Sequence, residues 1–258
     1  MKKKLAVAIL LSGGGSNAQA IMDACKEGWL QAEICVVGSD RMEAGGLERA
    51  ASMGVDHFVV DYKGILEHPD AASLFPVPRD FDVEAVLKKQ SLFPKGHDME
   101  KVRTFFTRRA AAERLLLDAL LPYDIDLLVL AGFMRTLSPY FIDGIQREEQ
   151  FPRIMNIHPA LLPSFPGPDG YGDTWRHGCR IGGCTVHFVD YGEDSGPIVG
   201  QAAFSIFPED SLEEVRRKGL EQEWSLYPAC IQLYAEGRLV LEGRPGRDGK
   251  IRRVVVCS

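Results

Sequence analysis

The chain has 258 residues, of which 45% are hydrophobic and 26% are charged, and this is enough for one large α/β domain with a substantial core. Its formal net charge of −6 provides no broad cationic surface of the kind that long nucleic-acid contacts require, so nucleic acid is not an expected partner. The apolar run Leu5–Leu11 is too short to span a bilayer, and no membrane partner is expected either.

The N-terminal part of the chain alternates between strand-like and helical patterns. Strands are predicted at Leu5–Leu11, Glu33–Val37 and His57–Val60, and helices at Asn17–Lys26 and Gly45–Met53. Such alternation is typical of βαβ units that build a parallel sheet. We therefore predict a Rossmann-like first half.

The segment Tyr62–His97 interrupts this pattern. It contains four prolines and several phenylalanines, and it is too long for an ordinary connection between a strand and a helix. We interpret it as an insertion that could act as a lid. A long helix is predicted after it, over Asp98–Leu121, and then a short buried strand, Leu127–Ala131.

The second half of the chain is predicted to contain further strands and one more long helix. The strands are Arg153–Ile157, Cys184–Val189 and Ile198–Phe204. The helix begins near Asp210 or Ser211 and continues past Tyr227. Because proline has no backbone N–H, Pro228 should kink this helix or divide it.

The last residues have the pattern of a β-hairpin. Strands at Leu239–Glu242 and Ile251–Val256 would be joined by the turn-rich segment Gly243–Gly249. Together, the elements predict an α/β fold whose twisted, mostly parallel sheet is covered by helices on both faces.

The loop Ser12–Asn17 lies between the first strand and the first helix and reads Ser-Gly-Gly-Gly-Ser-Asn. Glycines let backbone N–H groups turn toward an anion, and the start of a helix adds donors and a favourable dipole. Phosphate is the natural ligand, although the loop has neither Walker nor dinucleotide-binding spacing. A tight turn capped by Ser16 fits the same residues, and the loop alone does not decide between the two.

Asn156 and His158 stand two residues apart beside the predicted strand Arg153–Ile157. Residues with that spacing on extended backbone project to the same side, so the carboxamide and the imidazole can converge on one point. Two such donors suit an oxyanion that develops on a carbonyl oxygen. Taken singly, each residue is as well explained by a structural role.

The segment Asp190–Pro197 is an acidic loop between two predicted strands. A carboxylate from this loop, Asp194, could accept a hydrogen bond from His158 and favour the protonated ring. Asp194 would then orient the imidazole and accept a proton during catalysis. A solvated acidic turn explains the glycine and proline of this loop equally well.

The six cysteines are scattered and contain no Cys-x-x-Cys pair, which suits free thiols in a reducing cytoplasm. Cys179 and Cys184 could hold a metal only with further ligands such as His177 or His187. No compact set of four ligands is apparent, so we expect no metal and a cytoplasmic location.

Together these segments resemble the glycinamide ribonucleotide formyltransferase family, through most of the chain and in the expected order. The matching stretches are Ser12–Asn17, Ala131–Arg135, Asn156–Pro163, Thr185–Val189, Asp194–Pro197 with Gln201, and Glu223 ahead of Tyr227 and Pro228. The shared order of six separate stretches makes the resemblance specific.

The resemblance implies a role for each matching segment. The backbone of Gly15, Ser16 and Asn17 would hold the ribonucleotide phosphate, and Glu223 would contact the glycinamide end near its amine. The catalytic set would be Asn156, His158 and Asp194. The folate would be bound by Phe133, Met134, Arg135, Leu137, Val189, Asp190 and Asp194.

The implied reaction moves a formyl group from 10-formyltetrahydrofolate, a reduced folate that serves as co-substrate, to the amine of glycinamide ribonucleotide. The amine would attack the formyl carbon directly while Asn156 and protonated His158 stabilise the tetrahedral oxyanion. Asp194 would help to carry a proton from the amine to the departing folate nitrogen. The resemblance places this step in de novo purine biosynthesis.

The resemblance also implies a Rossmann-like formyltransferase fold, with one domain over residues 1–258. Within it we expect a phosphate-binding half at about 1–125, a folate-binding and catalytic half at about 126–236, a C-terminal hairpin at about 237–258, and the insertion at about 62–97. The oligomeric state is left open, with a homodimer as one option.

The sequence departs from the family pattern in three places. The glycine-rich segment Pro168–His177 replaces a shorter segment with a histidine that enters a helix, Trp224 stands where histidine is common, and Tyr62–His97 is unusual. The first difference concerns local substrate contacts, and the other two could alter the amine-binding side, so the exact acceptor is not fixed by the resemblance.

Three other functions fit parts of the sequence. Formylation of methionyl-tRNA usually needs a further C-terminal domain, whereas only about twenty residues follow Gly237. Hydrolysis of formyltetrahydrofolate usually comes with an extra N-terminal domain, whereas the first strand here begins close to residue 1. A folate or nucleotide sensor would have no need of Asn156, His158 and Asp194.

Overall fold

The computed structural model describes residues 3–94, 96–146, 151–246, 249 and 251–258. At its centre is a seven-stranded sheet in the order β3-β2-β1-β4-β5-β6-β7. These strands are β1 (Leu5–Leu11), β2 (Ala32–Ser39), β3 (Asp56–Val59), β4 (Leu127–Leu130), β5 (Ile154–His158), β6 (Ile181–Phe188) and β7 (Ile198–Ser205). The strands from β3 to β5 pair in parallel, and β6 and β7 are antiparallel. The predicted mostly parallel sheet is therefore confirmed.

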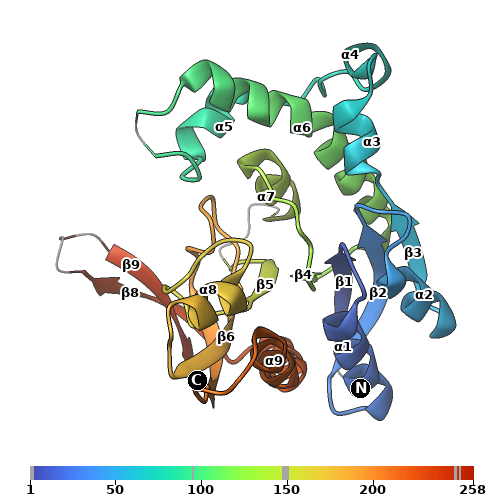
Figure 1. Cartoon of the computed structure of the whole chain (residues 1–258). Coiled ribbons are helices and arrows are strands. Elements are labelled where there is room, and N and C mark those ends of the chain that lie inside the picture. The colour runs from blue at the N-terminus through green and yellow to red at the C-terminus, as the bar shows by residue number, and fades with distance from the viewer. Residues whose placement is uncertain (1–2, 95, 147–150, 247–248, 250) are drawn as a thin grey trace.

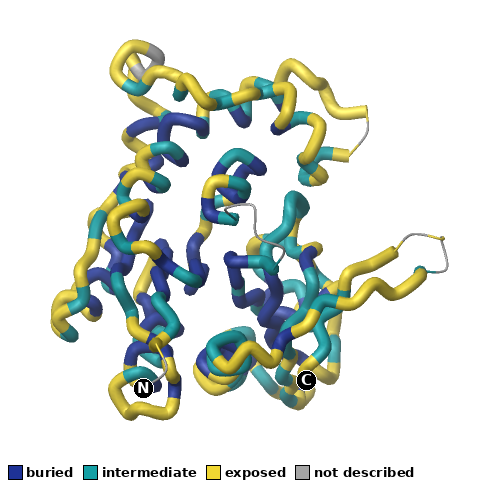
Figure 2. Tube along the Cα trace, turned by 180° about the vertical axis from the view of Figure 1, so that it is seen from behind, coloured by how far each residue is buried: buried dark blue, intermediate teal, exposed yellow. Residues whose placement is uncertain are grey.

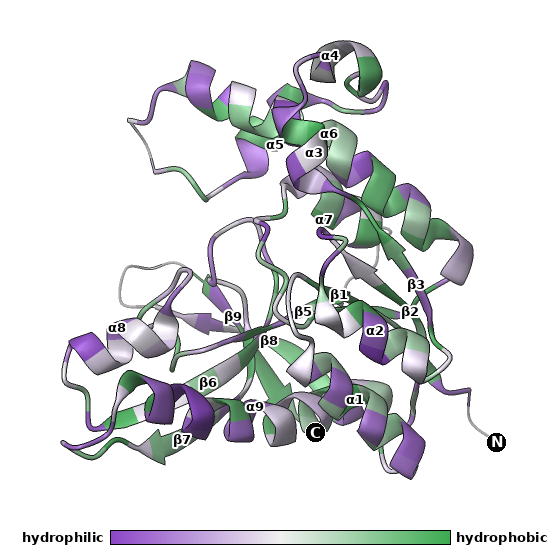
Figure 3. Cartoon of the chain, turned by 45° about the vertical axis from the view of Figure 1, so that its right-hand side comes forward, coloured by the Kyte–Doolittle hydropathy of each residue, from purple (hydrophilic) through white to green (hydrophobic). Residues whose placement is uncertain are grey.

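Helices cover both faces of this sheet, as predicted (Figure 1). Val7, Ile9 and Leu11 of β1 pack in a core with one group of helices, whereas Ala8 and Leu10 pack in a second core on the opposite face. The first group is α1 (Ser16–Glu27), α2 (Gly45–Ser52) and α9 (Leu212–Ala235); the second is α3 (Tyr62–Glu67), α6 (Met99–Leu120) and α7 (Pro139–Gln146). Figure 2 shows the buried strands between more exposed outer segments, and Figure 3 shows polar residues on the outer sides of α1 and α9.

The order of the strands reverses between β1 and β4, since the chain first builds outward from β1 to β3 and then returns to build β4 and β5 on the other side. In sheets of this kind ligands bind at the carboxyl ends of the strands beside such a reversal. The loops after β1 and β4 lie together there. The Ser12 N–H donates to the Gly132 carbonyl at 3.0 Å, and the Met134 N–H donates to Ser12 Oγ at 2.8 Å.

Several helix boundaries follow from capping residues. Asp98 accepts hydrogen bonds from the backbone N–H groups of Glu100 and Lys101 and thereby begins α6, while Leu121 ends it. Ser211 and Glu214 form a capping box at the start of α9. The predicted starts of both helices are thus confirmed to within a residue.

Of the two outcomes predicted for Pro228, division of the helix is wrong, because α9 runs without a break from Leu212 to Ala235, while the kink stays a prediction. Tyr227 and Pro228 are both buried. The packing of α9 on α1, β6 and β7 fixes the helix on either side of Pro228, so tertiary contacts outweigh the local cost of the proline.

The segment after β3 contains three short helices, which are α3, α4 (Ala71–Leu74) and α5 (Val83–Lys89). In Figure 1, α4, α5 and the first part of α6 lie beyond the end of the sheet, whereas α3 and the last part of α6 pack on its face. Two further short helices are η1 (Leu121–Tyr123) and α8 (Gly170–Arg176). The glycine-rich segment Pro168–His177 therefore does enter a helix.

The C-terminal hairpin forms a separate two-stranded sheet of β8 (Leu239–Pro245) and β9 (Ile251–Cys257). Gly243, predicted to begin the turn, pairs with Arg253 inside the ladder. The predicted turn is therefore too long at its start, and its residues 247 and 248 lie outside the described residues.

All six cysteines are free thiols. Within the described parts of the chain, no three His, Cys, Asp or Glu side chains are grouped so that they could hold a metal ion. In the same parts, no helix has the length and apolar character needed to cross a membrane.

Glu113 is a fully buried carboxyl on α6 and gives a pH-dependent contribution to stability. It accepts hydrogen bonds from the Ser138 N–H, at 2.8 Å, and from the Ser138 hydroxyl. Burial raises the pKa of Glu113 from 4.5 to about 7, although the Ser138 hydrogen bonds act in the opposite direction. The folded state therefore binds this proton more tightly than the unfolded state, and stability falls as the pH rises between these two values.

We predict that Glu113→Gln removes this part of the pH dependence. The free energy of unfolding of the wild-type protein, relative to that of the variant, should fall by on the order of 3 kcal/mol from about pH 4.5 to about pH 7. Urea unfolding over that range measures it. Glu100→Gln, at an exposed position of the same helix, is the control and should keep the wild-type pH dependence. If the free energy of unfolding changes with pH by the same amount in wild type and Glu113→Gln, the prediction is wrong.

Candidate active site

A cavity of about 620 Å³ opens at the carboxyl ends of β1, β4 and β5, beside the reversal of strand order. Every residue that the sequence singles out for catalysis or binding lines this one cavity. They are Gly15, Ser16, Asn17, Phe133, Met134, Arg135, Leu137, Asn156, His158, Val189, Asp190, Asp194 and Glu223.

The glycine loop forms one end of the cavity. Gly15 has a φ of 71° and is the N-cap of α1, with no side chain capping the helix, so the interpretation of Ser16 as N-cap is wrong. The first N–H groups of α1 therefore have no side-chain acceptor in the cap and can donate to an anion. The loop is held from behind, since the Gly46 N–H donates to the Gly13 carbonyl and Arg49 Nε donates to the Gly14 carbonyl.

Glu223 lies next to this loop and is held from both sides. Asn17 Nδ2 donates to Glu223 Oε2 at 2.6 Å, and Tyr171 Oη donates to Glu223 Oε1 at 2.6 Å. Burial raises the pKa of Glu223, and these two hydrogen bonds partly oppose that shift. The Tyr171 ring fits over Gly219, where a Cβ would come within 2.1 Å of the ring.

Asn17 Oδ1 is buried and accepts no hydrogen bond from the described residues. A buried acceptor without a partner is costly, so this atom is suited to a ligand N–H. Asn17 and Glu223 together present acceptor oxygens to the cavity, which is an arrangement that suits an amine.

Asn156 and His158 both lie on β5 itself rather than after it, and their two-residue spacing directs both side chains into the cavity. The antiparallel register of β5 and β6 places His187 directly opposite Asn156. Asn156 Nδ2 lies 3.2 Å from His187 Nε2, and His187 Nδ1 lies 3.0 Å from the Phe188 carbonyl. A neutral His187 that donates from Nδ1 accepts the Asn156 amide at Nε2, and the other amide N–H can then donate to a ligand.

Burial lowers the pKa of His187, against the opposing effects of the Phe188 carbonyl and the Asp194 charge. His187 therefore keeps its neutral form to lower pH than an exposed histidine. This form is the one that can accept the hydrogen bond from Asn156.

His158 is buried and lies between two acceptors. Its Nδ1 is 3.2 Å from Asp194 Oδ2, and its Nε2 is 2.8 Å from the Phe165 carbonyl. A doubly protonated ring can donate to both. Asp194 Oδ2 also accepts the Gly167 N–H at 2.9 Å, and Asp194 Oδ1 lies 3.6 Å from His187 Nε2.

The loop that carries Asp194 has a defined shape. Asp194 adopts a left-handed φ of 48°, which is uncommon for a residue with a side chain. Asp190 Oδ1 accepts hydrogen bonds from the Gly192 N–H and the Ser195 hydroxyl, and this closes the loop on itself. The backbone is thus constrained where it directs Asp194 toward His158.

The segment after β4 forms the opposite wall of the cavity. Phe133 packs edge-on against Tyr62, with ring centroids 6.3 Å apart. Arg135 Nε donates to the buried carboxylate of Asp40 at 2.5 Å, so its guanidinium is already paired within the protein. Met134 is 58% exposed and is the side chain of this segment that a ligand could most readily contact.

The sequence alone did not identify two residues of this site, His187 and Tyr171. His187 faces Asn156 across the β5 and β6 ladder, and a register for the strand Cys184–Val189 would have revealed it. Tyr171 comes from the divergent segment Pro168–His177 and reaches Glu223 only because that segment folds into α8. No local sequence signal marks the second contact.

We predict that Asp194→Asn lowers the pKa of His187 further, because the Asp194 charge is one of the groups that raise it. Titration of the histidine ring signals by NMR measures the change. Glu193→Gln, which alters an exposed carboxylate in the same loop, should leave the His187 titration where it is. An unchanged or higher pKa in Asp194→Asn would show that the two groups are not coupled.

Comparison with known proteins adds an independent observation to this geometry. The model of the family described as "Formyl transferase" matches residues 5–231. The chain is 35% identical to phosphoribosylglycinamide formyltransferase of Haemophilus influenzae, over 94% of this chain and 91% of the relative, and 33% identical to that of Escherichia coli, over 95% and 94%. Its structure is similar to glycinamide ribonucleotide transformylase 1 of Symbiobacterium toebii, with a TM-score of 0.71, 36% identity and coverage of 98% and 96%.

Proposed function

Because this chain belongs to the formyl transferase family, we propose that it transfers the formyl group of 10-formyltetrahydrofolate to the amine of glycinamide ribonucleotide, a step of de novo purine biosynthesis. Relatives that align with more than nine-tenths of the chain carry the name phosphoribosylglycinamide formyltransferase. This likeness favours a small phosphorylated amine over methionyl-tRNA or water as the acceptor.

One observation carries the proposal for the site. The cavity joins a set of anion donors, the start of α1, to a set of amine acceptors, Glu223 and Asn17, and then to the pair of donors Asn156 and His158. A phosphorylated amine that extends from the first set to the second has its nitrogen directed toward the third. The cavity therefore supports the order phosphate, amine and formyl group.

At the acceptor end, Glu223 would hold the amine. Its buried carboxyl has a raised pKa, so it binds a proton more readily than an exposed glutamate and suits an ammonium group that must lose a proton before attack. Asn17 Oδ1 would accept a second amine N–H. Tyr171 would keep the carboxylate in place during this exchange.

At the formyl group, the amine nitrogen would form a bond to the formyl carbon, and the carbonyl oxygen would take up the negative charge. Asn156 would donate its second amide N–H to that oxygen. His158 would donate from Nε2, which now faces the Phe165 carbonyl, so the formyl oxygen must take over or share that hydrogen bond.

The intermediate would then collapse, so that the bond from the formyl carbon to folate N10 breaks. The proton that Glu223 takes from the ammonium before attack stays on that carboxyl until the product leaves. Once the new bond has formed, the amine nitrogen must lose a second proton, and Asp194, which is already within reach of His158, would accept it and pass it to N10. No covalent bond to the protein is needed in this sequence. No step assigned to the side chains requires a metal.

The folate would lie between the segment after β4 and the loop after β6. Phe133, Met134 and Leu137 would contact the pteridine from one side, and Val189, Asp190 and Asp194 from the other. Arg135 is paired with Asp40, so we assign its contribution to the backbone rather than to the guanidinium. The cofactor proposal rests on family membership together with this lining.

The proposed function is tested by assaying formyl transfer from 10-formyltetrahydrofolate to a panel of phosphorylated amines, with folate absorbance as the readout. Glycinamide ribonucleotide should have the highest kcat/KM. Turnover of another amine at a higher kcat/KM, or release of formate without any acceptor, would replace the proposal.

We predict that Gly14→Val weakens binding of the acceptor phosphate selectively. A Cβ at Gly14 meets no protein atom within 4 Å, and Gly14 itself lines the cavity, so we expect the larger side chain to fit the fold and to occupy space beside the phosphate. The KM for the acceptor should rise by about tenfold or more, because the valine side chain would keep the phosphate from reaching the backbone N–H donors, while the KM for folate stays nearly unchanged.

Gly15→Val is the informative contrast. A Cβ at Gly15 would come within 2.6 Å of the Gly46 backbone, and its φ is positive, so this variant should lose stability as well. Thermal unfolding separates the two effects. If a stable Gly14→Val protein shows equal increases in the KM for the acceptor and the KM for folate, the assignment of the glycine loop as the phosphate site is wrong.

We predict that Asn156→Ala lowers kcat by about 10²–10³, which is the usual cost of losing one oxyanion donor. Asp194→Asn should cost much less in a His158→Ala background than in the wild type, because the carboxylate has then lost the imidazole that it orients. Single-turnover formyl transfer measures both effects. A near-normal rate in His158→Ala, or full additivity in the double variant, would contradict the proposed catalytic set.

A further inference from the structure

We propose that the segment Asp80–Ser91 is a brace that holds the Asp190–Gly196 loop in position, with Tyr191 and Asp143 as the connecting residues. This inference rests on the proposed function only where it concerns folate binding and transfer. It assigns to an otherwise unexplained part of the chain a positioning role toward Asp194.

Ser91, two residues after the end of α5, contacts the loop directly. The Ser91 N–H donates to the Tyr191 carbonyl at 2.9 Å. Gly192 lies so close that a Cβ at that position would be 3.0 Å from Ser91 Oγ. The backbone on either side of this contact belongs to residues that are a hundred positions apart in the sequence.

Asp143 on α7 joins the same two segments through its carboxylate. Tyr191 Oη donates to Asp143 Oδ1 at 2.6 Å, and Lys89 Nζ lies 2.6 Å from Asp143 Oδ2. Lys89 Nζ also lies 5.8 Å from the centre of the Tyr191 ring. The Tyr191 side chain is thus tied to Asp143 and is not among the residues that line the active-site cavity.

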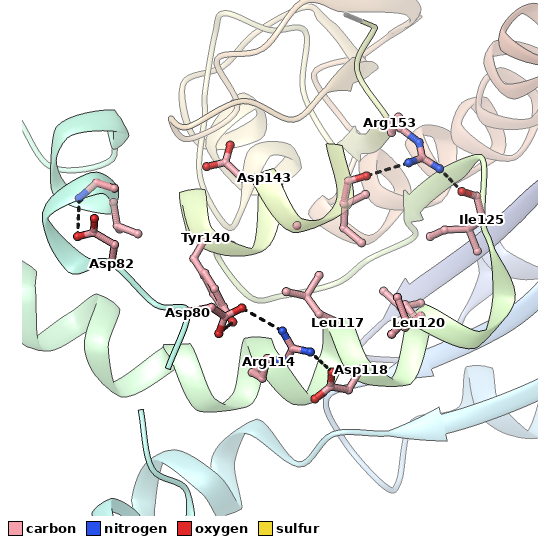
Figure 4. A pocket seen from close by; sticks show the side chains of 15 residues that line it. Asp80, Asp82, Arg114, Leu117, Asp118, Leu120, Ile125, Tyr140, Asp143 and Arg153 are labelled. Atoms are coloured by element: carbon pink, nitrogen blue, oxygen red, sulfur yellow. Dashed lines mark hydrogen bonds and ion pairs between the residues drawn. The ribbon is translucent and has the colours of Figure 1, made fainter. Parts of the chain in front are cut away.

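The brace is fixed at its other end to α6 and α7. Asp80 Oδ2 lies 3.0 Å from Arg114 Nη1, and Tyr140 Oη donates to Asp80 Oδ1 at 3.1 Å. Figure 4 shows Asp80, Arg114 and Tyr140 pointing toward one another, and Asp143 further along the same helix as Tyr140. The Phe81 ring packs edge-on against Tyr140, with centroids 5.3 Å apart.

An apolar cluster supports the middle of the segment. Val86 is buried with Val102 and Phe106 of α6, and the partly buried Phe81, Leu87, Leu92, Phe93, Phe105 and Tyr140 pack against them. A segment that is packed along its length and bonded at both ends can transmit a fixed position to the loop it contacts. This favours a fixed support over the lid that the sequence suggested.

The Asp190–Gly196 loop carries Asp194, so a support that holds this loop also affects the proposed chemistry. Asp194, three residues after Tyr191, is the partner of His158, and its left-handed φ depends on the path of the loop. Val189 and Asp190, just before Tyr191, line the folate part of the cavity. A looser Tyr191 would therefore disturb folate contacts and the Asp194 carboxylate, but not the glycine loop.

The first experiment compares Tyr191→Phe, Asp143→Ala and their double variant in the full-length protein. Each single change should raise the KM for 10-formyltetrahydrofolate by about five- to tenfold and lower kcat by a smaller factor, leaving the acceptor KM unchanged. The double variant should be no worse than Asp143→Ala, because both changes break the same contact. An unchanged folate KM, or additive losses, would overturn the brace.

Arg103→Met is the matched control. Arg103 forms a 2.6 Å ion pair with Glu84 on α5, which is similar in length to the Lys89–Asp143 pair but does not reach the loop. It should leave both KM values unchanged, because an exposed ion pair contributes little and the apolar cluster around Val86 still holds α5 on α6. If Arg103→Met raises the folate KM as much as Tyr191→Phe does, the effect comes from general loosening of the segment, and the proposed role of Tyr191 and Asp143 is wrong.

A second measurement does not depend on the proposed reaction. Backbone hydrogen exchange in ligand-free Tyr191→Phe should be faster over residues 190–196 by about five- to tenfold and unchanged over residues 13–17. If the wild type fails to transfer formyl but Tyr191→Phe still shows the expected faster exchange over residues 190–196, the proposed function is rejected and the brace stands. Unchanged exchange in the loop would reject the brace whatever the activity.

Discussion

One buried side chain, Tyr227, ties α9 to two central strands of the sheet beside the candidate site. Its hydroxyl lies 2.8 Å from the Met155 carbonyl and 3.1 Å from the Leu130 carbonyl, and the residue is fully buried. These carbonyls belong to β5 and β4, two adjacent strands, so the contact fixes α9 against both of them. Glu223, one helical turn earlier on the same face, is thereby directed at the glycine loop. Desolvation raises the pKa of the Tyr227 hydroxyl well above its ordinary value, which keeps it a donor.

A chain of polar groups continues from these strands through the cavity. Asn156, His187, Asp194 and His158 each have a partner among the others, and backbone groups of Phe188, Phe165 and Gly167 complete the set. Buried polar groups are costly unless they are satisfied, and a satisfied network favours a single arrangement. The cost of burying two imidazoles and a carboxylate is thus offset by the contacts that also align them.

Patterns that depend on nearby residues were sufficient to predict most of the fold, the glycine loop and the convergence of Asn156 with His158, whereas Glu223 and the folate-binding residues were expected only from the family resemblance. The alternation of apolar runs predicted the parallel strands, Asp98 and Ser211 marked helix starts, and the spacing of Asn156 and His158 placed both in the cavity. Local patterns could not predict contacts between segments that are distant in the sequence. His187 depends on the register of two strands, and the unbroken α9 depends on packing around Pro228 that no local pattern encodes.

The pairing of Tyr171 with Gly219 has a consequence for the history of this site. The ring occupies the volume that any side chain at position 219 would need, so neither position can change size alone without a clash or a void. Descendants of this chain should therefore exchange the two residues together, a large one at 219 appearing only with a small or differently shaped one at 171. The hydrogen bond from Tyr171 to Glu223 therefore depends on the absence of a side chain at position 219.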